Sequence, residues 1–115
     1  MNIMVLKDEG LNIEVINQCF GGNEDIYFKF LRRFFEDNDY INFNELMVNG
    51  TYSEAFISAH ALKGVAGNLG MIKIYEYLLV IVEKLRNFDY DDLEDLYISF
   101  KKECDRIQMV AERMV

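Results

Sequence analysis

The chain of 115 residues contains no proline. Proline breaks the interior of a helix, because it lacks a backbone N–H and its ring clashes with the preceding turn. A proline-free chain in which 51% of the residues are hydrophobic and 14% are aromatic is therefore suited to long helices around a substantial core. At this length we expect one domain, residues 1–115, of the all-α class.

The spacing of the apolar residues predicts one short helix and four longer ones. The short helix covers 11–20 and is closed by two glycines. The second helix begins after Asn23, whose side chain can cap it, and runs to about Val48. Three further helices are predicted over 51–69, 71–85 and 91–114.

Local signals define the third helix. Thr51 and Glu54 form a capping-box pattern at its start, and Gly70 stands where a left-handed residue would end it. Since the connections are short, neighbouring helices must run antiparallel. The expected fold is an up-down-up-down four-helix bundle with a short extra N-terminal helix.

The second helix carries more apolar residues than one face can hold. Phe28 and Phe35 lie off the main stripe, so they either join the core or form a surface for a partner. The stripe expected to face the core contains Tyr27, Phe30, Leu31, Phe34, Ile41 and Val48.

Charge and composition exclude several classes of function. A net charge of −8 and a pI of about 4.6 argue against a nucleic-acid-binding protein, which needs a basic face. Cys19 and Cys104 occupy apolar helix positions, so we expect two buried free thiols. The sequence shows no signal peptide, no apolar run near the roughly 20 residues that cross a bilayer, and no spacing typical of a metal site. We expect a cytoplasmic protein with no metal, cofactor or membrane partner.

The single histidine, His60, lies in the third helix. On a helical wheel it is roughly 140° from the centre of the apolar stripe, and Gly64 and Gly67 lie on the same outward face. A glycine inside a helix costs about 1 kcal/mol relative to alanine, so two glycines beside one histidine need a reason. Bare backbone would let the active site of another protein approach the imidazole. Lys63, three residues after His60, could reach a phosphoryl group on the ring.

The segment "AHALKGVAGNLG" resembles the signature of the histidine-containing phosphotransfer (HPt) domain family, roughly H-x-L-K-G, then five residues of any type and a second glycine. The segments "CFGGNEDIYFKFLRRFFED" and "YLLVIVEKLRN" are similar to the helices that flank the site in that family. The resemblance implies that His60 accepts a phosphoryl group, Lys63 assists with its oxygens and Gly64 leaves room for phosphate and partner. Val65 is a departure, because the family often has serine or alanine there.

The resemblance also implies a function and partners. His60 would accept a phosphoryl group from the aspartyl phosphate of a receiver domain and pass it to another receiver, in a relay that begins at a hybrid histidine kinase. The chain has no glycine-rich loop for ATP, so it would be a carrier and not an enzyme, with magnesium held by the receiver. We expect a monomer. An adaptor that binds receivers or other signalling proteins without being phosphorylated is the alternative.

The docking surface for such a partner is expected around His60. It would combine exposed residues of the third helix with off-stripe aromatic residues of the second. The predicted docking residues are Ile57, Ala61, Gly67, Asn68, Phe28 and Phe35.

Overall fold

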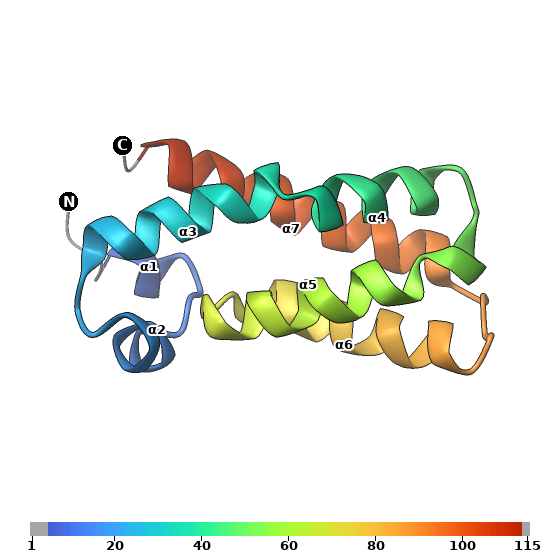
Figure 1. The fold of residues 1–115 in the computed structure, drawn as a ribbon, viewed down its shortest axis with the longest axis horizontal. Helices are drawn as coiled ribbons and strands as arrows, with labels where there is room; N and C mark the ends of the chain where they lie inside the picture. The colour runs from blue at the N-terminus through green and yellow to red at the C-terminus, as the bar shows by residue number, and fades with distance from the viewer. Residues whose placement is uncertain (1–4, 114–115) are drawn as a thin grey trace.

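The computed structural model describes residues 5–113, and within that range the chain is all-helical (Figure 1). The predicted all-α class is confirmed. The described residues also contain one isolated β-bridge, between Leu11 and Met71. The helices are α1 (Val5–Asp8), α2 (Ile13–Phe20), α3 (Glu24–Glu36), α4 (Asn38–Val48), the 3-10 turn η1 (Tyr52–Glu54), α5 (Phe56–Asn68), α6 (Ile72–Arg86) and α7 (Leu93–Arg113).

The longer helices lie side by side along a molecule of 41 × 22 × 22 Å (Figure 1). Helix α5 packs mainly against α6, and α6 against α7, while α4 contacts α5 and α3 contacts α7. In Figure 1, α5 and α6 run in opposite directions, as do α6 and α7. No helix within residues 5–113 combines the length and apolar character needed to cross a membrane.

The predicted long second helix is wrong, because the chain breaks at Asp37. This residue has extended backbone angles (φ −69°, ψ 145°), and its carboxylate accepts a hydrogen bond from the Asp39 N–H at 2.9 Å, so it caps α4. The break resets the phase of the helix. Tyr40 and Phe43 of α4 therefore enter the core.

The break also overturns part of the predicted core stripe. Tyr27, Leu31 and Phe34 are buried as expected. The exposed members are Phe30, Ile41 and Val48. Both Phe28 and Phe35 are buried in their place, with exposed fractions of 5% and 6%.

The start of α5 also differs from the prediction. Thr51 makes no side-chain capping hydrogen bond, and η1 precedes the α-helix, which begins at Phe56. Phe56 is thus the first residue of α5, and His60 lies one helical turn after it.

The C-terminal end of α5 is fixed by α2 and α3. Gly70 has a φ of +70°, as the sequence predicts, and its carbonyl accepts a hydrogen bond from the Asn12 N–H at 2.9 Å. The Tyr27 hydroxyl donates to the Leu69 carbonyl at 2.8 Å. Burial raises the pKa of Tyr27, so this donor keeps its proton at neutral pH.

The two cysteines differ in their surroundings. Cys104 is buried as predicted, and burial raises the pKa of its thiol. The prediction for Cys19 is wrong, because this residue is exposed near the end of α2. The short helix α2 buries only Ile16 completely, and its other side remains open to solvent.

Candidate functional site

Helix α5 separates a buried face from an exposed one, as its sequence predicts. The exposed face carries His60, one turn after the start of the helix, and Gly64, one turn further on. The inward positions Ala55, Ala59, Leu62, Ala66 and Leu69 are all buried.

The His60 side chain is exposed and rests beside an aromatic ring. Its centroid lies 5.9 Å from that of Phe56, one turn earlier in the helix, with the two ring planes inclined by 44°. The Phe56 ring therefore lies against one side of the imidazole, and His60 remains exposed to solvent. An exposed, supported imidazole can act as a nucleophile toward a group brought by another molecule.

Gly64 leaves open space next to His60. A Cβ atom built at Gly64 would meet no heavy atom within 4 Å. Packing inside this chain therefore does not require glycine at that position. The cost of glycine in a helix is instead consistent with an approaching partner, as the sequence analysis expects.

Lys63 lies at the flank of the site and is half-buried. Among residues 5–113 no carboxylate forms an ion pair with it. Lys63 and Gly64 border a groove of about 570 Å³ that runs between α5, α6 and the start of α2. Its ammonium group is thus available for an anion at the surface of α5.

Gly67 has a packing role that Gly64 lacks. A Cβ atom at Gly67 would lie 3.3 Å from Cδ2 of Tyr75 on α6, tighter than an ordinary contact. The missing side chain lets the Tyr75 ring approach α5. Gly67 is half-buried and lines the same groove as Lys63, as does the exposed Asn68.

The structure divides the predicted docking residues into two groups. Ile57 is 78% exposed, and Ala61 is half-buried on the same face of α5 as His60. The prediction for Phe28 and Phe35 is wrong, because both rings are in the core, where Phe28 packs edge-to-face on Tyr27 and Phe35 on Tyr40. The phase of α3 that buries them turns the neighbouring Phe30 outward.

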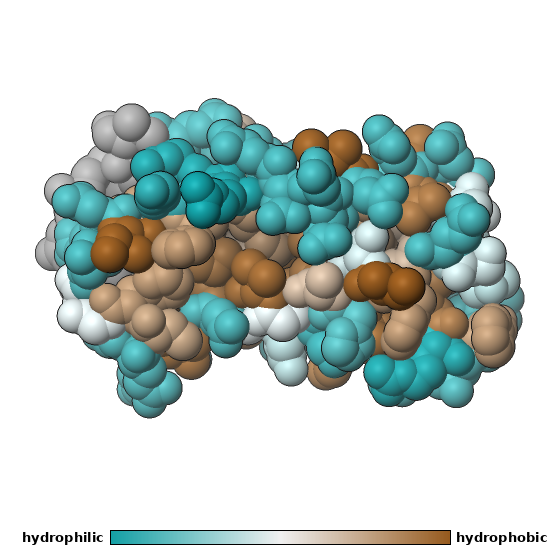
Figure 2. All heavy atoms as spheres, in the orientation of Figure 1, coloured by the Kyte–Doolittle hydropathy of each residue, from teal (hydrophilic) through white to brown (hydrophobic). Residues whose placement is uncertain are grey.

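An apolar groove borders the exposed face of α5 at Val65, the residue after Gly64. Its walls are mostly exposed or half-exposed side chains of α2, α3 and α5, with the buried Leu69 at its base, and its volume is about 580 Å³. Figure 2 shows hydrophobic side chains gathered on the corresponding part of the surface, below α3 in the left half of the view. The groove, called the apolar groove below, is lined by Cys19, Phe20, Ile26, Phe30, Val65, Asn68 and Leu69.

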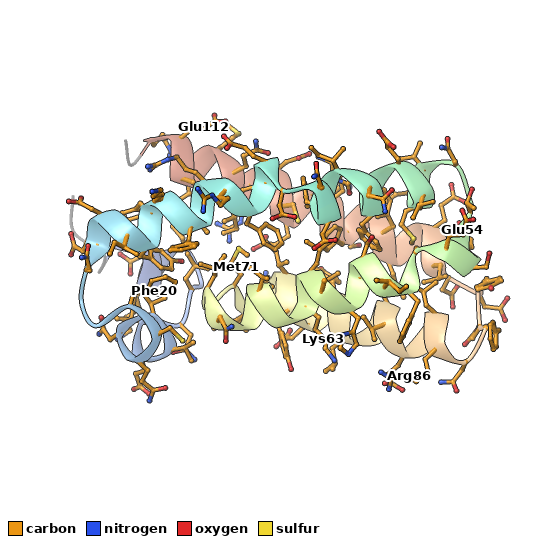
Figure 3. All side chains as sticks on the ribbon, viewed as in Figure 1. Phe20, Glu54, Lys63, Met71, Arg86 and Glu112 are labelled. Carbon is orange, nitrogen blue, oxygen red and sulfur yellow. The ribbon has the colours of Figure 1, made fainter. Side chains whose placement is uncertain are left out.

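Arg86, at the end of α6, is a site residue that the sequence analysis missed. Its guanidinium carbon lies 5.5 Å from the centroid of the Phe56 ring, and its Nη1 donates to Glu83 at 2.6 Å. Figure 3 shows Lys63 and Arg86 on the same edge of the molecule. The signal in the sequence is the short connection between α5 and α6. It makes the two helices antiparallel and so brings the end of α6 near the start of α5.

The described residues contain no cluster of three or more potential metal ligands from histidine, cysteine, aspartate or glutamate. Comparison of the chain with models of protein families, with curated proteins and with solved structures found no match.

Proposed function

We propose that the protein is a phosphohistidine carrier of the HPt type, built as an antiparallel four-helix bundle with its short N-terminal helices at one end. The observation that carries the proposal is the arrangement on α5. An exposed histidine is followed at the third position by a lysine that has no ion-pair partner among residues 5–113, and at the fourth by an unobstructed glycine. A nucleophile, a cation for phosphoryl oxygens and space for a second protein are thereby brought together on one helix face.

The reaction is a transfer between His60 and an aspartate of a receiver domain. An imidazole nitrogen attacks the phosphorus of the aspartyl phosphate, and the P–O bond breaks with its electron pair leaving on the carboxylate. The other ring nitrogen then releases its proton to solvent. Passage to a second receiver is the same step in reverse, with a carboxylate as the nucleophile.

The chain's own contribution is to position and stabilise. Phe56 supports the imidazole, Lys63 reaches the phosphoryl oxygens, and Gly64 admits the receiver's loops. Magnesium belongs to the acidic pocket of the receiver in this proposal. The receiver would seat on the exposed residues Ile57 and Ala61 and on the apolar groove.

The test is phosphoryl transfer from a receiver domain charged with radiolabelled phosphate. We expect the wild type to take up label that is lost in acid and stable in alkali. His60→Gln, which leaves an exposed position of similar size, is expected to take up none. Label on the variant would contradict the proposal. Binding of receivers without labelling of the wild type would instead favour the non-phosphorylated adaptor.

A further inference from the structure

A phenylalanine follows the end of α6 at a position where three other helices of this chain are followed by glycine. Two hydrogen bonds close a Schellman motif there. The Asp89 N–H donates to the Lys84 carbonyl at 2.9 Å, and the N–H of the preceding residue donates to the Leu85 carbonyl at 3.2 Å. That preceding residue is Phe88, and the motif gives it a left-handed φ of +54°. The left-handed residues after α2, α4 and α5 are Gly21, Gly50 and Gly70.

Neither the backbone nor the packing accounts for an aromatic residue at Phe88. A bulky L-residue is strained at a positive φ, whereas glycine adopts this conformation freely. The Phe88 side chain is 77% exposed, so burial in the core does not offset the strain. An exposed ring on strained backbone is explained by contact with another molecule.

The loop that presents Phe88 is held in one shape by its own side chains. Lys84 forms an ion pair with Asp89 at 3.1 Å, and its ammonium group also donates to the Asp91 carbonyl at 2.9 Å. The Asp91 N–H donates in turn to the Asp89 carboxylate at 3.1 Å. A side chain on such a preorganised loop loses less conformational entropy on binding than one on a flexible loop.

Other apolar side chains lie at the same end of the bundle. Figure 1 shows the connection from α4 to α5 and the connection from α6 to α7 together at the end away from α1 and α2. The centroid of the Tyr90 ring lies 5.5 Å from that of Tyr52, which joins the α6–α7 loop to η1. Tyr52 also lines a groove of about 420 Å³ together with the exposed residues Val48 and Ile98. The distal surface, as it is called below, consists of Phe88, Tyr90, Tyr52, Val48 and Ile98.

The charge around the distal surface is negative. Residues 87–100 contain no lysine or arginine, and all of their acidic side chains are exposed. Lys84 and Arg86, which precede them, are each paired with a carboxylate. Within residues 5–113 no ion pair involves the last four of these acidic residues, which are Asp89, Asp91, Asp92, Glu94 and Asp95.

This charge restricts what can cover the exposed rings. Nucleic acids and anionic membranes are repelled by a cluster of carboxylates. The same end of a second copy of the chain is repelled as well, because a symmetric contact would place carboxylates against carboxylates. A protein partner that brings lysine or arginine beside an apolar surface is complementary in both respects.

We propose that the distal surface is a second docking site, which binds a cationic amphipathic segment of a partner protein. The apolar side of the segment would cover Phe88 and Tyr90, and its basic side chains would face the carboxylates around them. The site does not include His60, Lys63 or Gly64. The inference therefore goes beyond the proposed relay and does not depend on it.

The test uses the whole chain labelled with 15N and a peptide of about 18 residues, in which leucine and lysine are arranged as an amphipathic helix. A scrambled peptide of the same composition has the same charge but no apolar face. We expect the amphipathic peptide to shift the amide signals of residues 48–52 and 87–98 selectively. The scrambled peptide should cause only weak shifts, which disappear at about 1 M salt because charges are then screened.

Phe88→Gly should separate a binding role from a structural one. The variant should raise the Kd of the amphipathic peptide by about 10-fold or more, as for the loss of an aromatic anchor. It should also raise the urea concentration at the midpoint of unfolding, because glycine relieves the strain at positive φ. Phe88→Asn is a second variant that tolerates left-handed backbone, and it should weaken binding to a similar extent without destabilising the protein.

The contribution of charge is measured with the double variant Asp91→Asn and Asp92→Asn. Exposed ion pairs are weak, so the Kd should rise by only about 3-fold, and the difference should shrink at high salt. Met109→Ala is the matched control for an exposed apolar side chain. Met109 lies on α7, roughly 16 Å along the helix from Ile98, and the variant should leave the Kd unchanged.

Several results would overturn the inference. They are equal binding of the two peptides, the absence of selective shifts, and an unchanged Kd for Phe88→Gly. A lower urea midpoint for Phe88→Gly would show that the ring serves the fold. Shifts of the distal surface that depend on protein concentration without peptide would identify a second copy as the occupant, contrary to the proposal.

The measurement requires neither a receiver nor a phosphoryl group, so its outcome is separate from that of the relay. Selective binding of the peptide by a protein that no receiver labels would mean that the relay is wrong and the distal site is correct. Normal labelling of His60, combined with a distal surface that does not bind the peptide, would mean the reverse.

Discussion

Two glycines of the same segment, Gly64 and Gly70, occupy opposite environments. At Gly64 an added Cβ would meet nothing within 4 Å, and the backbone is helical. At Gly70 the φ is +70°, and an added Cβ would lie 2.8 Å from the backbone oxygen of Asn12. The fold requires glycine at Gly70, while nothing in the fold requires it at Gly64.

This difference separates architecture from function within one motif. A glycine that the packing demands carries no information about a partner, because it would be needed in any case. A glycine that lowers helix stability, at a position where a side chain would fit, is explained by the approach of another molecule. Gly64 therefore supports the proposed docking of a partner much more than Gly70 does.

The largest effect is expected for Gly70→Ala, which should lower the free energy of unfolding by about 3 kcal/mol. A positive φ costs an L-residue roughly 1–2 kcal/mol, and the clash with Asn12 adds to that. Urea denaturation measures the change. Gly50→Ala is the control, because Gly50 has a φ of +72° with nothing within 4 Å, and should lose only about 1 kcal/mol. Equal losses would mean that Asn12 does not restrict Gly70.

Gly64→Leu should keep the stability of the protein and impair its phosphoryl transfer. Leucine is a better helix former than glycine by roughly 0.8 kcal/mol, so the variant should be at least as stable as the wild type. Transfer from a charged receiver should fall by about 10- to 100-fold, because the side chain occupies the space of the partner. Initial rates of label uptake measure this. Normal transfer by the stable variant would mean that the receiver does not come close to the backbone at Gly64.

A smaller effect is expected from the apolar groove beside Gly64. Phe30→Ala should weaken receiver binding by about 5- to 10-fold, as for the loss of one moderately buried contact, with little change in stability. Phe28→Ala is the matched comparison, since its ring is in the core, and should cost about 3–4 kcal/mol of unfolding free energy. Titration calorimetry and urea denaturation give the two quantities. If Phe30→Ala leaves affinity intact, the partner docks elsewhere.

The smallest change in unfolding free energy is predicted for Gly67→Ala. The space at Gly67 is intermediate, since an added Cβ would meet the Tyr75 side chain, whereas it meets nothing at Gly64 and backbone at Gly70. The gain of about 1 kcal/mol in helix propensity is offset by a displacement of the Tyr75 ring by a few tenths of an ångström, so we expect a net change within about 0.5 kcal/mol. Thermal unfolding at fixed pH measures it. A loss above about 2 kcal/mol would place Gly67 with Gly70 as a residue that the packing requires.

The sequence was sufficient for the helical class and for the two faces of α5. The absence of proline and the spacing of Ala59, Leu62 and Ala66 reflect local rules that tertiary contacts rarely override. Because inward and outward positions follow directly from the 3.6-residue period, the exposure of His60 was also predictable.

The break at Asp37 was not predicted, because two patterns competed. In a continuous helix Phe34 and Ile41 share a face, whereas Tyr40 lies about 120° away from Phe34. The cap at Asp37 instead lets Tyr40 follow Phe34 into the core, where the Tyr40 ring contacts Phe34 and Phe100, and such contacts between helices are not visible in the spacing of one helix. Arg86 was missed for a related reason: its proximity to Phe56 depends on how α5 and α6 align, which the spacing within either helix does not contain.

The hydrogen bonds at the end of α5 have a consequence for how the protein folds and opens. Tyr27 and Leu69 are 42 residues apart in the chain, and Asn12 and Gly70 are farther apart still. Contacts of such long range form late, since the entropy of closing the intervening chain must be overcome first. The last turn of the histidine-bearing helix therefore depends on the earlier docking of α2 and α3. In the native state its amide hydrogens should exchange with solvent when those helices detach, as one cooperative unit with them.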